Sequence, residues 1–267
     1  MTTLGELSLP MVDILWEDQR LGAIPFPLEV RSHGDTAAER ARIRAAVYTE
    51  LERRELAENG RIGADLEYAL GLLANPTVTV DLVALREMTD ETPVRALVAA
   101  RGKRAVLAVQ HRLAVRLTMV RQSAIANSIV ELLPASRYGP GPSVTLPAAA
   151  LAQESVPRTG RHRRDETSGG VLRTATRQAD RTAELRFLDA IMERPVVRAG
   201  SFGVALREEG GKLRRLPGIG FFDTDLGRYA TSVSRGVDGE DWTTLSPSDN
   251  DRLSHRLTET LLAALRQ

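Results

Sequence analysis

Cysteine is absent from the 267 residues of this chain. Disulfide bonds, thiolate metal sites and cysteine nucleophiles are therefore excluded. Lysine is nearly absent as well, because only Lys103 and Lys212 occur and the other 34 of the 36 basic residues are arginine. Together with the abundance of alanine and leucine, this bias indicates a GC-rich genome rather than selection for phosphate binding, which requires clustered basic residues.

Long apolar runs are also missing. No window of the sequence approaches the roughly 20 apolar residues that a membrane-spanning helix needs. The first 20 residues lack a basic region and carry Glu6, Asp13 and Glu17 among their apolar residues, which is not the pattern of a signal peptide. These observations predict a cytoplasmic protein without stable membrane insertion.

Charge is close to balanced, with a formal net charge of +1. Such a balance favours neither nucleic acids nor strongly acidic partners. The one basic cluster, at residues 158–164, contains no aromatic residue and is followed at once by Asp165 and Glu166. We interpret it as part of a solvated, mobile loop at about residues 155–176, with a nucleic-acid or partner contact as the alternative.

Residues that could carry catalysis do not group in the sequence. The histidines are scattered, and none has a second histidine at metal-ligand spacing, so we predict no metal site. Residues 199–203 approach a nucleophile elbow around Ser201, but Ala199 replaces the required glycine and the serine enters a strand. We predict no cofactor, because no glycine-rich loop precedes a helix. A small hydrolase or transferase with an unrecognised site remains the alternative function.

The strongest organisational signal is a repeated order of elements. Two strands and a helix are predicted at residues 105–133, and the same order recurs at residues 228–265. Alternating apolar residues at 113–119 are typical of one face of an antiparallel sheet. The sequence therefore predicts an α+β fold in which helices pack against a central antiparallel sheet, built from two related halves at about residues 1–137 and 143–267.

Several local signals predict where individual elements begin. Residues 4–15 are predicted to form an amphipathic helix interrupted by Pro10, and residues 26–30 a short proline-flanked strand. Thr36 fits the start of a capping box. At the last helix, Ser246 is expected to cap and Pro247 to occupy the first helical position.

Five segments in order resemble a known family. They are LSLPMVDILWEDQRLGAIPFPLEV, ARGKRAVLAV, YGPGPSVTLPAAAL, FFDTDLGRYATSV and DGEDWTTLSPSDNDRL. Their order and spacing are similar to those of the EspG family of ESX (type VII) secretion-associated proteins of actinobacteria. The resemblance covers nearly the whole chain as a single EspG-like domain, residues 1–267. It implies a central antiparallel sheet with helical bundles and quasi-two-fold symmetry.

The resemblance also implies a function without catalysis. Family members are cytosolic chaperones that bind the helical tip of the PPE subunit in a PE–PPE heterodimer, keep it soluble and release it for export. An apolar tip of this kind aggregates unless it is covered. The polar 155–176 loop is not a family signature, so an ESX substrate of another class is the alternative partner.

We hypothesise that the open sheet face of the C-terminal half and the last helix form the groove for this partner. Alternating strand residues and a leucine row are more commonly core than interface, so each candidate has a structural alternative. The candidate contacts are Phe202, Val204, Leu206, Phe222, Trp242, Leu257 and Leu261.

Overall fold

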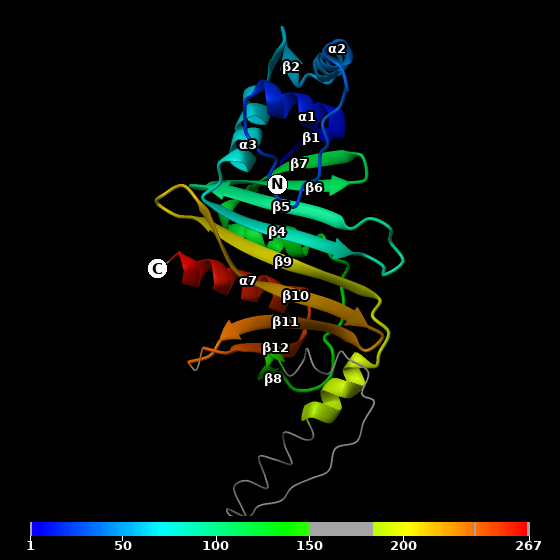
Figure 1. The fold of residues 1–267 in the computed structure, drawn as a ribbon, viewed down its shortest axis with the longest axis vertical. Helices are drawn as coiled ribbons and strands as arrows, with labels where there is room; N and C mark the ends of the chain where they lie inside the picture. The colour runs from blue at the N-terminus through cyan, green and yellow to red at the C-terminus, as the bar shows by residue number, and fades with distance from the viewer. Residues whose placement is uncertain (1, 150–183, 238, 266–267) are drawn as a thin grey trace, which may run out of the picture.

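The computed structural model describes residues 2–149, 184–237 and 239–265. Within these ranges, ten strands form one sheet and follow one another along the long axis of the molecule (Figure 1). In order across the sheet they are β1 (Thr2–Ser8), β7 (Ala114–Arg121), β6 (Arg104–His111), β5 (Val94–Arg101), β4 (Val78–Leu85), β9 (Arg198–Arg207), β10 (Leu213–Thr224), β11 (Gly227–Arg235), β12 (Asp241–Ser248) and β8 (Val144–Pro147).

The strand order is the same when read outward from the centre of the sheet. In the N-terminal half, β4 to β7 form a meander and β1 pairs beyond β7; in the C-terminal half, β9 to β12 form a meander and β8 pairs beyond β12. The halves meet where β4 and β9 pair antiparallel, with Leu82 opposite Phe202. This topology confirms the predicted α+β fold with two related halves.

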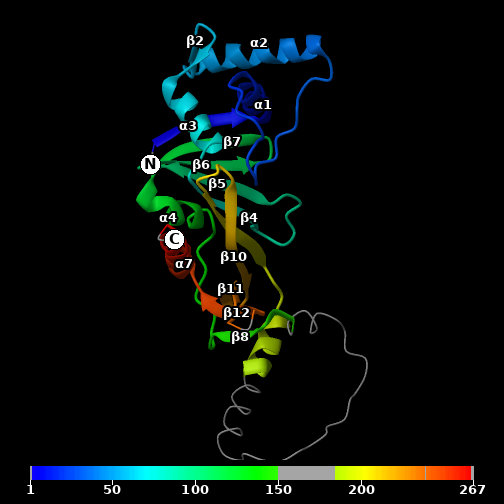
Figure 2. The same cartoon turned by 60° about the vertical axis from the view of Figure 1, so that its left-hand side comes forward.

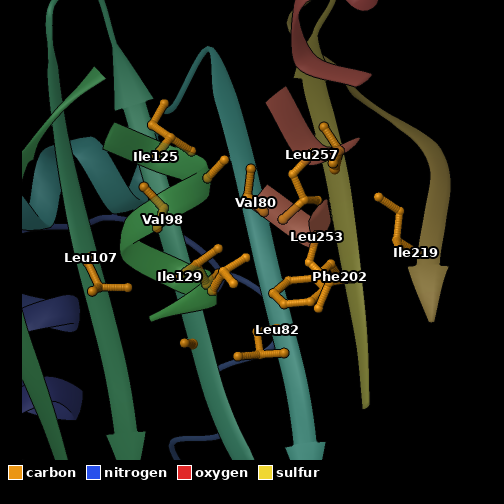
Figure 3. Packing of buried hydrophobic residues seen from close by; sticks show 14 of the residues in the cluster. Val80, Leu82, Val98, Leu107, Ile125, Ile129, Phe202, Ile219, Leu253 and Leu257 are labelled. Atoms are coloured by element: carbon orange, nitrogen blue, oxygen red, sulfur yellow. The ribbon is translucent and has the colours of Figure 1, made fainter. Parts of the chain in front are cut away.

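One face of the sheet is covered by two helices that have equivalent places in the halves. Helix α4 (Ile125–Val130) follows β7, and α7 (Asn250–Ala264) follows β12. The two helices lie side by side on the same side of the sheet (Figure 2). Between them and the strands lies the largest cluster of buried apolar side chains, in which Phe202 of β9 lies beside Leu253 of α7 (Figure 3).

Among the described residues, helices cover the opposite face at its two ends. Over the N-terminal half pack α1 (Leu9–Asp18), α3 (Ala64–Ala74) and, outside them, α2 (Ala37–Arg53), whose C-terminal end meets the small hairpin of β2 (Ala57–Glu58) and β3 (Arg61–Ile62). Over the C-terminal half, residues 184–192 form a helix that buries Leu188 and Ile191 against Tyr229. The centre of this face therefore has no helix over it among the described residues.

The N-terminal residues form a strand where the sequence predicts a helix. Thr2–Ser8 pairs with β7, and the helix begins only at Leu9, with the Ser8 hydroxyl accepting from the backbone N–H of Met11 at 3.4 Å. The spacing of Leu4 and Leu7 fits a helix, but pairing with β7 satisfies the backbone along a sheet edge instead. Tertiary pairing outweighs the local pattern here.

The start of the last helix is also displaced from its prediction. Ser246 and Pro247 belong to β12, where Pro247 lies opposite Tyr229. The cap is Asp249, whose carboxylate accepts from the backbone N–H of Arg252 at 2.8 Å. The predicted strand at residues 26–30 is likewise absent from the sheet; Phe26 and Pro27, joined by a cis bond, form a turn, and residues 28–30 have no regular secondary structure.

One further predicted helix start is confirmed, and one predicted helix is shorter in the structure. The Thr36 cap is confirmed, since its hydroxyl accepts from the Glu39 backbone N–H. The helix expected through residue 133 consists of a 3-10 turn, Gln122–Ala124, followed by α4, which ends at Val130. The loop expected at residues 155–176 lies outside the described residues.

Candidate functional site

The segment 223–229, which contributes to the family resemblance, has a structural role. Arg228 is fully buried and binds Asp223 through Nε–Oδ1 at 2.6 Å and Nη2–Oδ2 at 2.9 Å. The same guanidinium also donates to the Pro134 carbonyl at 3.1 Å and to the Asn250 side chain. One side chain thus joins the β10–β11 hairpin, the end of the N-terminal half and the first residue of α7.

The Gly-Pro segment between the halves is seated on the same hairpin. Tyr229 donates its hydroxyl to the Pro140 carbonyl at 3.1 Å. Gly139 lies so close to the Tyr229 ring that a Cβ would come within 2.8 Å of its Cε2. Gly141 approaches the Phe187 ring more closely still. These two glycines are needed because the linker backbone passes directly over aromatic rings.

Five of the seven predicted partner contacts lie in the core rather than on a surface. All of them belong to the apolar cluster beneath α4 and α7, and none exposes more than 8% of its surface: Phe202, Val204, Leu206, Leu257 and Leu261. The hypothesis assigned them to an open face, but α7 covers that face. A partner could reach them only if α7 left the sheet, so the structure assigns them to folding instead.

Leu257 provides a test of this assignment. We expect Leu257→Ala to lower the free energy of unfolding by about 2–5 kcal/mol, because the side chain is fully buried. Leu262→Ala on the exposed side of the same helix is the matched control and should change it by less than about 0.5 kcal/mol. Urea unfolding of both variants measures the difference. Equal, small effects would make Leu257 a candidate surface contact again.

The remaining two candidates are half-buried. Phe222, on β10, stacks on Tyr229 with ring centroids 5.5 Å apart and lines a groove on the face opposite α7. Trp242, on β12, lies opposite Pro147 of β8 and is not part of that groove. Of the seven predicted contacts, Phe222 alone lines this hollow.

The groove occupies the part of the sheet over which residues 2–149, 184–237 and 239–265 place no helix, and it has a volume of about 610 Å³. Its rim on one side comes from the connection between β4 and β5, with Met88 and Pro93. The other side is formed by the end of helix 184–192 and the residues before β9, with Met192 and Val196. These apolar rim side chains are exposed, Met192 to 63% and Met88 to 48%. Exposed methionines are adaptable contacts for a partner.

The floor of the groove is made of small residues. Gly200 and Ser201 of β9 lie beside Gly220 of β10, and Thr231 follows on β11. A Cβ on Gly220 would overlap the Thr231 hydroxyl oxygen, so the missing side chain at Gly220 adds depth to the groove. Gly200 lies on the Phe202 side of β9, where a Cβ would come within 2.6 Å of the Ala84 Cβ.

A charged pair lies next to the groove on the same face. Asp81 and Gly203, which pair across β4 and β9, are each two residues from the groove residues Val83 and Ser201. Arg215 binds both carboxylate oxygens of Asp81 through Nη2, at 3.0 and 2.8 Å, and its guanidinium lies over the Phe26 ring. Burial raises the pKa of Asp81, and Arg215 opposes this shift.

The sequence contained partial signals for this site. Small residues at 199–201, and the two glycines Gly218 and Gly220, interrupt strands that are otherwise apolar. Such a pattern can indicate close approach of another backbone. Met88 stands in a polar connection and Met192 at the end of a helix, and no periodicity distinguishes either residue. Their convergence depends on pairing between β4 and β9, which are more than 100 residues apart in the chain.

No group of three or more metal-ligating side chains gathers in the parts of the chain that the structure describes. In those ranges no hydrogen bond joins Ser201 to a histidine; His33 pairs with Asp13 and His255 with Glu259. Across the same ranges, no helix combines the length and apolar character needed to span a bilayer.

The fold and groove define an antiparallel-sheet protein with an apolar groove on one face of the sheet. A model of the EspG family matches residues 8–259, and the chain belongs to this family. Among solved structures it is similar to the Mycobacterium tuberculosis type VII secretion system chaperone EspG5, determined in complex with a PE25–PPE41 dimer. The TM-score is 0.66 at 12% identity, over 94% of this chain and 92% of that one. No curated protein sequence matches the chain.

Proposed function

We propose that this EspG-family chain is a cytosolic chaperone of type VII (ESX) secretion. It binds the helical tip of the PPE-type subunit in a PE–PPE heterodimer, keeps that subunit soluble and delivers it for export. Residues 1–267 act as one domain, because the β4–β9 pairing makes a single sheet of the two halves. The EspG family is a family of secretion chaperones, and no observation favours the hydrolase or transferase alternative.

The observation that carries the proposal is the exposed apolar groove on the uncovered sheet face. Met88, Met192 and Val196 form its rim, and exposed apolar surface of this kind marks interaction sites. A groove with a small-residue floor admits a bulky segment close to the backbone of the sheet. The helical end of a PPE-type subunit presents apolar side chains that suit such a groove.

The direct test is co-expression with each PE–PPE pair encoded in the same genome, followed by size-exclusion chromatography. We expect a stable ternary complex with at least one pair, and a lower yield of soluble PPE subunit when this chain is omitted. Absence of a complex with every pair would overturn the proposal and turn the search to ESX substrates of other classes.

Variants on opposite faces locate the site. We expect Met192→Asp, at the groove rim, to weaken the ternary complex by about 10-fold or more, because it places an unpaired charge in an apolar contact. Leu262→Asp is the control, since that exposed leucine lies on α7 behind the sheet. Loss of binding with Leu262→Asp and not with Met192→Asp would move the site to the α7 face.

A further inference from the structure

In the Arg215–Asp81 ion pair, only one of the three guanidinium nitrogens contacts the carboxylate. Both carboxylate oxygens of Asp81 share the single nitrogen Nη2. Among the described residues, no hydrogen bond or ion pair involves Nε or Nη1 of Arg215. Arginine usually binds a carboxylate through two nitrogens. Here the N–H groups of Nε and Nη1 remain available to donate to another acceptor.

The position of the guanidinium is nevertheless well defined. It lies between Asp81 and the Phe26 ring, whose centroid is 5.0 Å from the Arg215 Cζ. Gly203 provides the space beneath it, because a Cβ there would overlap Nη2 and lie 2.7 Å from both Asp81 oxygens. Asp81 is buried, whereas 53% of the Arg215 side chain is exposed. Asp81, Phe26 and Gly203 thus form a cradle that fixes the guanidinium, and the unused N–H donors of Arg215 lie on its solvent side.

The distance along the strands connects this cradle with the groove. Two residues of extended strand span roughly 6.6 Å, so Asp81 and Gly203 lie one side-chain position beyond Val83 and Ser201 on the same face. A segment that fills the groove and continues along the sheet passes over Arg215. Such a segment would cover the exposed guanidinium and remove water from its free donors, which then need new acceptors.

Charge indicates which acceptor fits. Arg215 and Asp81 together are neutral, and a second carboxylate placed on Arg215 would be repelled by Asp81. Neutral oxygens with partial negative charge suit this pair better. The last four carbonyl groups of a helix have no partner within the helix and stand at the negative end of its dipole. The tip of a helical pair presents such an end.

We infer that Arg215, oriented by Asp81 and Phe26, is a specificity-determining contact that donates hydrogen bonds to main-chain carbonyl oxygens at the C-terminal end of a helix in the bound substrate. The inference rests on the proposed function and adds to it the orientation of the docking segment: its apolar side chains occupy the groove, and its helix ends over Arg215.

The test measures the affinity of a purified PE–PPE pair, the one that forms the ternary complex, by isothermal titration calorimetry. We expect Arg215→Met to weaken binding by about 10-fold or more, because hydrogen bonds from a charged donor contribute roughly 1.5–3 kcal/mol. Arg215→Lys keeps the charge but not the planar donors and should recover only part of the loss. Arg214→Met, on the neighbouring residue whose exposed ion pair is with Glu208, is the matched control.

Salt separates the two acceptor chemistries. If carbonyl groups are bound, the dissociation constant of the wild-type complex should change little between low and high salt. If Arg215 instead binds a carboxylate, the wild-type complex should weaken as salt is raised, and this salt dependence should disappear in Arg215→Met. That result would overturn the inference. Wild-type affinity in Arg215→Met would overturn it too while leaving the proposed function intact. If the wild-type chain binds no PE–PPE pair, the proposed function and the inference about Arg215 are both wrong.

Discussion

Replacing Ser201 by tryptophan should abolish substrate binding while the protein stays folded. Ser201 is exposed at the centre of the groove floor, and the residue beside it on β10 is Gly220, which leaves room for an indole. Tryptophan is favourable in strands, and its side chain would occupy the space that the proposed substrate tip needs. We expect the affinity to fall by at least about 100-fold, equivalent to about 2.7 kcal/mol.

The matched control is Ser234→Trp, which places the same side chain at another exposed strand serine, on β11 and outside the groove. It should leave binding unchanged. Calorimetric titration with the PE–PPE pair measures affinity, and circular dichroism verifies that both variants are folded. Wild-type affinity in a folded Ser201→Trp protein would show that the groove is not the docking site.

The second large effect concerns stability. Removing the Asp223 carboxylate by Asp223→Ala leaves Arg228 fully buried without its counter-charge. Arg198 also loses its ion pair with Asp223, at 3.2 Å. Breaking one side of a buried pair costs about 3–5 kcal/mol. For a chain of this length that corresponds to a fall in Tm of roughly 10 °C.

Two further variants separate the buried pair from ordinary surface charge. Glu208→Ala removes an exposed ion pair to Arg214 and should cost less than about 1 kcal/mol. The double variant Asp223→Leu/Arg228→Met should be more stable than Asp223→Ala, because no uncompensated charge remains. Thermal and urea unfolding of the set measures these differences. A cost below about 1 kcal/mol for Asp223→Ala would mean that Arg228 does not depend on this carboxylate.

The location of Arg228 explains why the effect should extend through the molecule. Its partners belong to the β10–β11 hairpin, to the end of the N-terminal half at Pro134 and to the start of α7. Loss of the pair would loosen the C-terminal half and the helix that covers its core. Substitution of Asp223 should therefore also lower the affinity for the substrate indirectly. The affinity of Asp223 variants has to be compared at temperatures where the variants remain folded.

Local periodicity in the sequence determined most elements and the class of the fold. The alternation at residues 113–119 predicted β7, and the leucine row predicted the helix α7, although Leu257 and Leu261 were expected to contact a partner and lie in the core. The two strand–strand–helix copies predicted the paired halves that the strand order confirms. The lack of cysteine is sufficient by itself to exclude thiol chemistry. These features depend on residue identity and on neighbours within a few residues, which the sequence contains directly.

Tertiary structure alone decided which residues face a partner. Alternation shows that Phe202 and Ser201 lie on opposite faces of β9, but it does not show that α7 covers the first and leaves the second open. The spacing of Leu4 and Leu7 fits a helix, and pairing with β7 made that segment a strand. The groove and the Arg215–Asp81 cradle both need β4 to pair with β9 across the centre of the sheet. Contacts between such distant segments follow from the packing of the whole chain, so no local pattern contains them.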